Sequence, residues 1–263
     1  MEYILLFRFT AITFRAKTTA RLEHYQLGVP RARFNAATTI RSLTVTKEIT
    51  MSTVLFVKGH PSNADTSVSV HLAERFLEAY KTANPSDTVT VLDLYKDNIP
   101  HIDADVMNAY GKFQSGRASE VTPEEGAKLA RIGQLSDQFV AADKVVFAAP
   151  MWNFGYPSMV KAYIDTGVVA QGKTFQYTPQ GPVGLLKGKG KKALILEASG
   201  GVYTGTPMEA HTHSNSHLKG ILGFVGIDDV SFISAEGMNQ SPEQREEIVA
   251  EATGRAVALA ATF

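Results

Sequence analysis

The sequence contains no cysteine. This absence excludes disulfide bonds, thiol nucleophiles, iron–sulfur clusters and zinc sites with thiolate ligands. A chain without thiols fits a reducing compartment, and we expect a cytoplasmic protein. No apolar run approaches the roughly 18 residues that a membrane-spanning helix needs. We therefore expect no association with a membrane.

An excess of positive charge is also missing from most of the chain. The net charge is zero, with 26 Lys and Arg against 26 Asp and Glu. Residues 1–50 are basic, with eight Lys and Arg against three Asp and Glu, so the remainder is mildly acidic. Because the larger part has no basic surplus, we do not expect it to bind nucleic acid.

The first fifty residues do not resemble the start of a folded domain. They are rich in Arg and Thr and poor in acidic residues, whereas the chain from Met51 begins like the first strand of an α/β protein. Three interpretations are open: a start site placed too early, a transit-like peptide, or a true accessory segment. We expect little ordered packing in residues 1–50. We expect one domain over 51–263, which is long enough for a sizeable core.

Apolar stretches alternate with turn signals along residues 51–263. Short apolar runs typical of parallel strands cover 53–58, 88–92, 144–149, 192–198 and 230–235. Helical spacing and capping signals predict helices over 67–82, 122 to about 142, 157–169, 207–224 and 241 to about 261. Residues 97–120 are expected to run over the surface. The pattern predicts a flavodoxin-like α/β fold: a five-stranded parallel sheet in the order 2-1-3-4-5, with helices on both faces.

The loop at residues 59–69 joins the first strand to a helix, and it is a candidate anion site. Backbone amides at a helix N-terminus are unpaired, and the helix dipole favours an anion there. Ser67 and Ser69 add hydroxyl donors. The loop has no lysine and no glycine pattern of the dinucleotide or Walker type, so a monophosphate such as that of FMN suits it best. The alternative is plain capping of the helix by Thr66 or Ser67.

Two further loops follow strands of the same sheet, where ligands of open α/β folds bind. In the first, Trp152 and Phe154 offer flat faces to a planar ring, and Asn153 can bond a ring edge. This combination suits an isoalloxazine ring, although the residues could instead form core beneath a loop. In the second, Gly200 and Gly201 permit close approach of the backbone to a ligand, or form an ordinary turn.

Several motifs together resemble one family. They are Ser52-Thr53-Val54-Leu55, Pro150-Met151-Trp152-Asn153-Phe154, Lys161-Ala162-Tyr163-Ile164-Asp165, Gly172-Lys173-Thr174-Phe175-Gln176-Tyr177-Thr178, Gly181-Pro182-Val183-Gly184-Leu185 and Ala235-Glu236-Gly237. This set resembles the FMN-dependent NADH:azoreductase and NAD(P)H:quinone reductase family of the flavodoxin-like superfamily. The resemblance covers essentially all of residues 51–263.

The resemblance implies a set of FMN-binding residues. The phosphate would be bound by His60, Ser67, Val68 and Ser69, the flavin and ribityl chain by Met151, Trp152, Asn153 and Phe154, and the ring edge by Ala198, Ser199, Gly200 and Gly201. Ser199 stands where the family usually has Arg, and His60 stands where many members have Ser.

The resemblance also implies a reaction and an assembly. NADH or NADPH would reduce bound FMN, and a quinone or azo compound would then take two electrons in a ping-pong cycle. The flavin carries the chemistry, so no protein nucleophile is expected. Tyr203, His60 or a residue of 113–117 is a candidate hydrogen-bond or proton donor. A homodimer with two flavin sites at the subunit interface is implied.

Two other interpretations belong to different classes. A flavodoxin-like protein could carry electrons without catalysis, or it could be an FMN-binding or nucleotide-binding regulatory module. Separately, His211, His213 and His217 have the look of a metal site, with the last two spaced for one face of a helix. Because no Cys and few carboxylates accompany them, a solvated polar face is favoured and no metal is expected.

Overall fold

The computed structural model describes residues 51–263. The expectations for residues 1–50, and for a domain boundary at residue 51, therefore lie outside the described residues and stay predictions. Within residues 51–263 no helix is long and apolar enough to cross a membrane.

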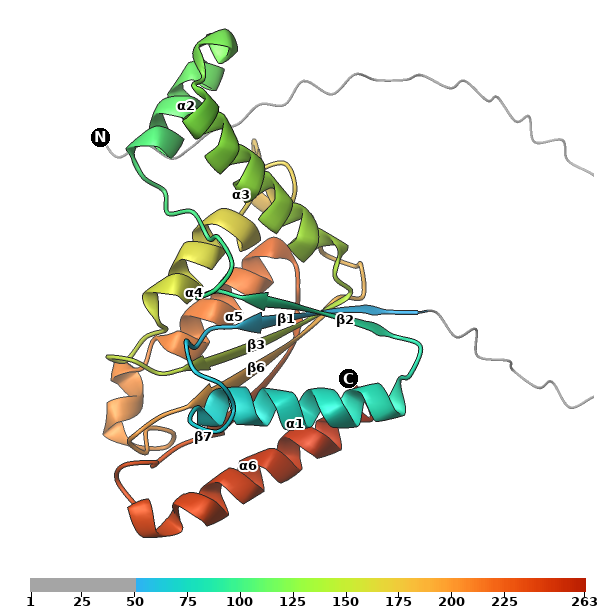
Figure 1. The fold of residues 1–263 in the computed structure, drawn as a ribbon, viewed down its shortest axis with the longest axis vertical. Coiled ribbons are helices and arrows are strands. Elements are labelled where there is room, and N and C mark those ends of the chain that lie inside the picture. Colours follow the sequence, from blue (N-terminus) through green and yellow to red (C-terminus); the bar gives the residue numbers. More distant parts are fainter. Residues whose placement is uncertain (1–50) are drawn as a thin grey trace, which may run out of the picture. The chain divides into compact units, whose positions relative to one another are not determined.

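A five-stranded parallel sheet forms the centre of the fold, in the order β2-β1-β3-β6-β7 (Figure 1). The strands are β1 (Thr53–Lys58), β2 (Thr88–Asp93), β3 (Lys144–Pro150), β6 (Lys192–Ala198) and β7 (Asp229–Ala235). The three central strands are almost continuously buried, which explains their unbroken apolar runs. The predicted fold, strand order and all five strands are confirmed.

Helices cover both faces of this sheet (Figure 1). One face packs against α1 (Val68–Ala83) and α6 (Arg245–Ala260), around a core that includes Phe76 and Tyr80. The other packs against α3 (Pro123–Ala141), α4 (Ser158–Tyr163) and α5 (Ser214–Val225), around Phe139 and Tyr163. Alternate residues of each strand enter the two cores, as the pleat requires.

The start of α3 follows the predicted capping signal. The Thr122 hydroxyl accepts a bond from the Glu125 amide, and the Glu125 carboxylate accepts one from the Thr122 amide at 2.9 Å. Pro123 occupies the first helical position, where its missing N–H costs nothing. This reciprocal capping box fixes where the helix begins.

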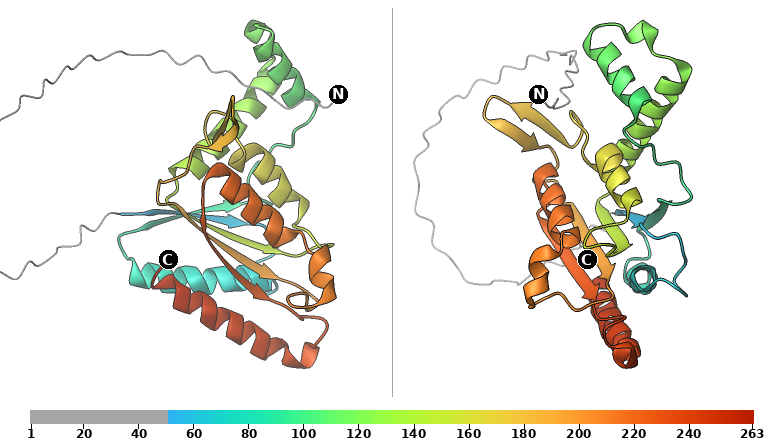
Figure 2. Two further views of the ribbon diagram at one scale, coloured as in Figure 1. Left: turned by 180° about the vertical axis from the view of Figure 1, so that it is seen from behind. Right: turned by 90° about the vertical axis from the view of Figure 1, so that its left-hand side faces the viewer.

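Residues 97–120 are more regular than predicted. They contain α2 (Ala104–Gln114) and a short 3-10 helix, η1 (Ala118–Glu120). Only Val106 and Ala109 of α2 are buried, so its apolar stripe is too weak to be recognised in the sequence. The helix packs on α3 and is tied to it by Lys112, whose ammonium bonds both oxygens of Glu125 at 2.7 and 2.9 Å. Figure 2 shows this helical pair extending beyond the sheet.

Three predicted helices are interrupted. Residues 157–169 form α4 followed by a π-helix, η2 (Ile164–Val168). A Cβ at Gly167 would lie 2.4 Å from the Tyr163 ring, so only glycine fits this wider turn. Residues 241–261 begin with a 3-10 turn, η4 (Pro242–Gln244), before α6, because Ser241 makes no side-chain cap.

The predicted helix at 207–224 is likewise two elements, a 3-10 helix η3 (Pro207–His211) and α5. The break lies at His213, whose amide donates to the Phe154 carbonyl at 2.8 Å instead of to a helical acceptor. This hydrogen bond matters for function because it joins the start of α5 to the loop after β3.

An antiparallel hairpin of β4 (Phe175–Thr178) and β5 (Gly181–Gly184) was not predicted. Figure 2 shows it projecting from the fold. It is anchored by Phe175, whose ring lies 5.1 Å from that of Phe224. Two glycines and a proline in β5 hide the strand signal, since these residues are poor strand formers.

Candidate functional site

The N-terminus of α1 lies at the carboxyl edge of the sheet, directly after β1. Ser67 is its N-cap, and the Ser67 hydroxyl accepts a 3.5 Å bond from the Val70 amide and lies 3.3 Å from the Ser69 hydroxyl. Val68 and Ser69 begin the helix, where the helix itself provides no acceptor for an N–H. Ser67 therefore does cap the helix, and the first-turn amides still point to the edge where an anion could bind.

Charge distinguishes this helix start from those of α2, α3 and α6, whereas the first turns of α4 and α5 are also free of acidic residues. The first turn of α1 holds no acidic residue. The first turns of α2, α3 and α6 do hold them, namely Asp105, Glu124, Glu125, Glu246 and Glu247. A carboxylate in the first turn competes with a bound anion for the same positive potential. The start of α1 is thus left free for a phosphate.

His60 stands in the loop between β1 and α1, beside the aromatic turn. Its Nδ1 accepts a 3.0 Å bond from the Ser62 amide, so Nε2 carries the hydrogen of the neutral ring. Burial, reinforced by the charge of Lys58, holds the pKa of His60 below its ordinary value. The ring meets Trp152 edge-on, with centroids 5.8 Å apart. At neutral pH His60 is a neutral hydrogen-bond donor.

Residues 152–155 form a tight turn immediately after β3. Trp152 and Gly155 exchange two backbone bonds, of 2.8 and 3.0 Å. Between them Asn153 and Phe154 have φ values of 49° and 65°. Two consecutive positive φ values define a type I′ turn, which normally holds Asn-Gly. Phenylalanine in this region is strained, and such strain gathers at functional sites.

The turn displays its aromatic side chains to solvent. Trp152 is 43% exposed and Phe154 is 40% exposed, and Asn153 is exposed between them. Phe154 is braced from behind by Tyr203, whose ring lies 6.0 Å away at 85°, and by His211 at 6.3 Å. Flat apolar faces held open by a rigid turn are suited to stacking on a planar ring.

The loop after β6 completes the edge. Ala198 ends the strand, and its carbonyl accepts a 2.9 Å bond from the Met151 amide, which joins this loop to the previous one. Ser199 is buried, and its hydroxyl donates to the Gly201 carbonyl at 2.9 Å. A Cβ at Gly200 would lie 2.8 Å from Asn239. There is thus no room for a side chain at Gly200, and the loop presents its backbone to a ligand.

Residues after β7 hold this loop in place, a feature that the sequence did not reveal. The amides of Gly237, Met238, Asn239 and Gln240 all donate to carbonyls of residues 199–201, at 2.9–3.1 Å. Glu236 accepts from the amides of Tyr203 and Thr204 at 2.8 and 3.0 Å. In the sequence, Glu236 is only part of the Ala235-Glu236-Gly237 motif. Its place at the end of β7, at the same edge, is the signal that could have given it a role.

The structure therefore brings all twelve predicted FMN-binding residues to three adjacent loops at one edge of the sheet. The candidate donors His60 and Tyr203 lie there too. Residues 113–117 do not, because they form the end of α2 and the turn after it, and α2 packs beside the end of α3 that extends away from the sheet (Figure 1). Within one chain they cannot act on a ligand at this edge.

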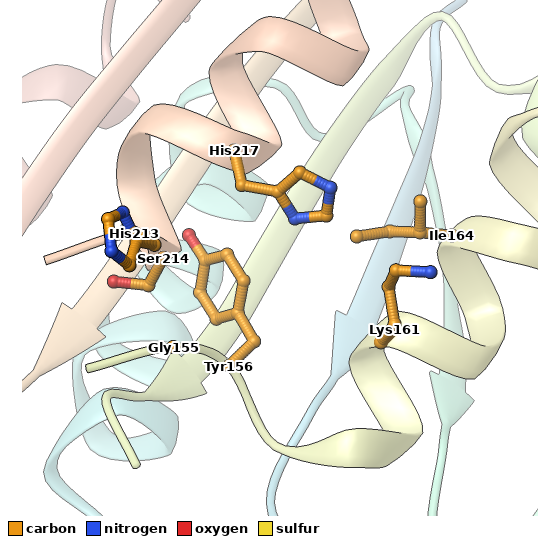
Figure 3. Close-up of a pocket in the computed structure, with 7 residues that line it drawn as sticks. All are labelled: Gly155, Tyr156, Lys161, Ile164, His213, Ser214 and His217. Atoms are coloured by element: carbon orange, nitrogen blue, oxygen red, sulfur yellow. The ribbon is translucent and has the colours of Figure 1, made fainter. Parts of the chain in front are cut away.

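A cavity of about 210 Å³ opens beside these loops, between α4 and the start of α5 (Figure 3). Its lining comprises Gly155, Tyr156, Lys161, Ile164, His213, Ser214 and His217. The hydroxyl of Tyr156 points toward the first turn of α5 (Figure 3). Two of the three clustered histidines thus line the cavity, while His211 contacts Phe154. In residues 51–263 no three His, Cys, Asp or Glu side chains converge as a metal site would require.

The geometry of the edge fits a phosphorylated flavin. An acid-free helix start suits the phosphate, the exposed aromatic turn suits the ring, and the Gly-rich loop suits a close backbone approach to the ring edge. Each requirement is met by a different loop. The His60 ring contacts Trp152 of the second loop, and a backbone bond from Met151 to Ala198 joins the second loop to the third. This division matches the rule that ligands bind beyond the carboxyl ends of strands, at the switch in strand order between β1 and β3.

Comparison with known proteins supports this reading. Residues 52–259 match the family model described as flavodoxin-like fold. An "FMN-dependent NADH:quinone oxidoreductase" of Bacillus pumilus is 50% identical over 214 residues, 81% of this chain and all of that protein. A Bacillus subtilis protein named "FMN-dependent NADH:quinone oxidoreductase 2" is 44% identical over the same shares.

Solved structures give the same result. The azoreductase AzrA superposes with a TM-score of 0.74 at 41% identity, over 81% of this chain and all of AzrA. An FMN-dependent NADH-azoreductase of Bacillus anthracis, determined with FMN, has a TM-score of 0.72 at 35% identity, over 80% of this chain and all of that one. Fold, site geometry and full-length similarity agree, and the chain belongs to the flavodoxin-like family that contains these FMN-dependent oxidoreductases.

Proposed function

We propose that the protein is an FMN-dependent NADH oxidoreductase that reduces quinones and cleaves azo compounds. The observation that carries the proposal is the set of three adjacent loops at one sheet edge, which together meet the requirements of a phosphate, a planar ring and a ring edge. Relatives named for this cofactor and these activities align over their whole length. NADH is the donor named for them.

Each loop has one task in this proposal. The first-turn amides of α1, with Ser67 and Ser69, would bind the phosphate. Trp152, Asn153 and Phe154 would contact the ring. The backbone of residues 199–201 would bind the ring edge. Bound FMN supplies the two-electron redox chemistry.

The reaction consumes a proton, so polar side chains at this edge could serve as hydrogen-bond or proton donors. Reduction of a quinone by NADH also consumes one proton: NADH, H⁺ and quinone give NAD⁺ and hydroquinone. The neutral His60 offers an Nε2–H, and Tyr203 offers a phenol, at the edge where the acceptor would lie. Both can donate hydrogen bonds to an acceptor oxygen, and either can be replenished from solvent.

The proposal is tested by the absorption spectrum of the purified full chain, followed by NADH without oxygen. A yellow protein that NADH bleaches, and that a quinone or azo dye restores, supports it. A yellow protein that NADH cannot bleach would point to an electron carrier. A colourless protein that takes up no added FMN would overturn the cofactor assignment.

We also propose a homodimer, on the evidence of exposed apolar side chains. Met107 and Phe113 of α2 are 43% and 47% exposed, and Tyr177 and Val183 of the hairpin are 38% and 41% exposed. Isolated apolar residues are common on surfaces, but here they occupy two projecting elements. Light scattering coupled to size-exclusion chromatography measures the mass. A monomer at micromolar concentration would refute the dimer.

The proposed location is the cytoplasm, because the reaction draws on a pool of reduced nicotinamide cofactor. Cell fractionation with antibody detection would test this, and recovery in a membrane or secreted fraction would contradict it.

A further inference from the structure

Buried polar atoms without partners gather at one place behind the candidate site. In residues 51–263, seven buried side-chain oxygens have no hydrogen-bond partner. Five of them belong to Tyr156, Glu197, Ser214, Asn215 and Ser234. These residues come from the loop after β3, the ends of β6 and β7, and the first turn of α5. An unsatisfied buried polar atom is costly, so a group of them calls for a function or a ligand.

Glu197 is the centre of this group. It is the second-last residue of β6, is 1% exposed and pairs in register with Ser234 of β7. Strand alternation places it on the face of the sheet covered by α5, since Ile195 on the same strand packs there. Ser199, at the start of the Gly-rich loop, is only two residues further along the chain.

No ion pair in the described residues includes Glu197, which separates it from the other strongly buried glutamate. Glu125 is 5% exposed and is neutralised by Lys112 at 2.7 Å. Glu197 instead faces the phenol of Tyr156, the hydroxyl of Ser214 and the carboxylate of Glu236. His213, His217 and Lys161 line only the adjoining cavity.

These surroundings disfavour a charge on Glu197. Burial raises the pKa of Glu197 to about 7; the Ser214 hydroxyl opposes this shift, and the Glu236 carboxylate adds to it. Burial and the proximity of Glu197 in turn raise the pKa of Tyr156. A buried carboxylate without a cationic partner gains a proton rather than remaining charged.

The cavity gives this proton a route to solvent. Tyr156 and Ser214 line the cavity and also face Glu197. A volume of about 210 Å³ is several times the roughly 30 Å³ that one water occupies in the liquid. Hydroxyl groups both donate and accept, so these two side chains can pass a proton between cavity water and the carboxyl group.

We propose that Glu197 is a positioning residue that holds a proton near neutral pH and, on losing it to cavity water, sets a negative charge behind the Ser199–Gly201 loop. The inference rests on the proposed function, because that charge acts on the electron-rich reduced cofactor. Ionisation of Glu197 breaks its O–H bond and releases one proton, with no change of oxidation state. Reduction adds negative charge at the loop, so like-charge repulsion favours the protonated form of Glu197 when FMN is reduced.

The first experiment uses flavin-free protein and the variant Glu197→Gln, which is isosteric and neutral at every pH. Infrared difference spectra across pH 5–9 should show a protonated carboxyl band in the unsubstituted protein that disappears with a midpoint near 7. Glu197→Gln should lack it, and Glu125→Gln, the matched buried control, should keep it. Ser214→Ala should move the midpoint upward, because it removes the opposing hydroxyl. Absence of the band from the unsubstituted protein would overturn the proposal, whether or not FMN binds.

The second experiment measures the midpoint potential of bound FMN against pH. Above pH 7 the potential of the unsubstituted protein should fall more steeply than that of Glu197→Gln. At pH 8 the variant should favour reduced over oxidised FMN on the order of tenfold more strongly, as expected for removal of a nearby charge. Parallel curves would refute the positioning role even if the carboxyl titrates. Failure of both proteins to take up FMN would instead refute the proposed function and leave the infrared result to decide the protonation of Glu197.

Discussion

The two edges of the sheet are built in opposite ways. At the amino edge, Asp87 accepts bonds from the Ser52 amide at 2.9 Å and the Tyr80 phenol at 2.5 Å. Lys144 bonds the Tyr80 oxygen at 2.6 Å and a backbone oxygen of Phe263 at 2.9 Å. Every member of this group has a partner. The carboxyl edge holds five unpartnered buried oxygens and a turn with two strained residues.

The difference separates stability from function. A fully paired network fixes its elements and leaves no group free for a ligand. Unpaired oxygens and backbone strain cost folding free energy, and they persist where a ligand or a proton uses them. The same sheet thus concentrates stabilising interactions at one edge and binding capacity at the other. Substitutions at the two edges should separate these properties.

The largest effect is expected at the amino edge, from Asp87→Ala. The substitution removes the carboxylate that lies 3.8 Å from the half-buried ammonium of Lys144, and it leaves the Tyr80 phenol without its acceptor. The free energy of unfolding should fall by about 3 kcal/mol, measured by urea denaturation. Affinity for FMN should not change. Glu78→Ala, which breaks an exposed pair with Arg75, is the control and should cost about 0.5 kcal/mol or less. A loss of FMN affinity in Asp87→Ala would break the proposed separation of edges.

Gly59→Ala tests close packing at the carboxyl edge. Its Cβ would lie 2.7 Å from Val160 Cγ2 and 3.0 Å from Ala149 Cβ. The loop should shift, at a cost of about 1–3 kcal/mol, and the FMN dissociation constant should rise. Gly111→Ala is the matched control, since a Cβ there meets nothing within 4 Å; in mid-helix it should stabilise by about 0.5–1 kcal/mol. Equal behaviour of the two variants would remove Gly59 from the site.

The strain in the aromatic turn is tested by comparing Phe154→Gly with Phe154→Ala. Both variants lose the ring and its contacts with Tyr203 and His211. Only glycine accepts the φ of 65° without strain. Phe154→Gly should therefore be more stable than Phe154→Ala by about 1 kcal/mol, measured by denaturation. Equal stability would mean that the turn relaxes in the variants. Both should raise the KM for a quinone.

The smallest effect is expected in the pH dependence of stability, through the ionisation of Asp87 at the amino edge. Burial opposes the charge on Asp87, but the Ser52 amide, Tyr80 and Lys144 together hold its pKa below the ordinary value. A depressed pKa contributes stability above the unfolded value of about 3.9, and this contribution is lost as pH falls through the folded value. The stability advantage over Asp87→Asn should thus shrink below about pH 4. An advantage that stays constant down to pH 2 would contradict this sign.

The sheet could be predicted because its central strands carry a simple signal. A strand such as Lys144–Pro150 is buried on both faces, so its apolar run is unbroken. Pro150 then marks the end of the strand, before the aromatic turn. The capping box at Thr122 is equally local. By contrast, α2 buries only two side chains, and the hairpin strand Gly181–Gly184 contains residues that avoid strands. Their stability comes from contacts with α3 and with Phe224, which no local pattern records.

The same distinction holds for the site. Its residues were predicted from loop composition and from resemblance, and they lie together at one edge. The type I′ geometry of Asn153 and Phe154 was not predicted, because the Gly that normally marks this turn is absent. The role of Glu236 and the isolation of Glu197 depend on how β7 and α5 pack. Contacts between segments that are distant in the sequence cannot be predicted from local sequence patterns.

The bonds between residues 199–201 and 237–240 have a consequence for biosynthesis. A ribosome releases the chain from its N-terminus, so the loops at Ser67 and Trp152 emerge well before β7. Until residue 240 has left the exit tunnel, residues 199–201 lack the four backbone bonds from residues 237–240. A nascent chain halted before β7 should therefore present an incomplete candidate site, and we expect flavin to bind only after the last strand docks.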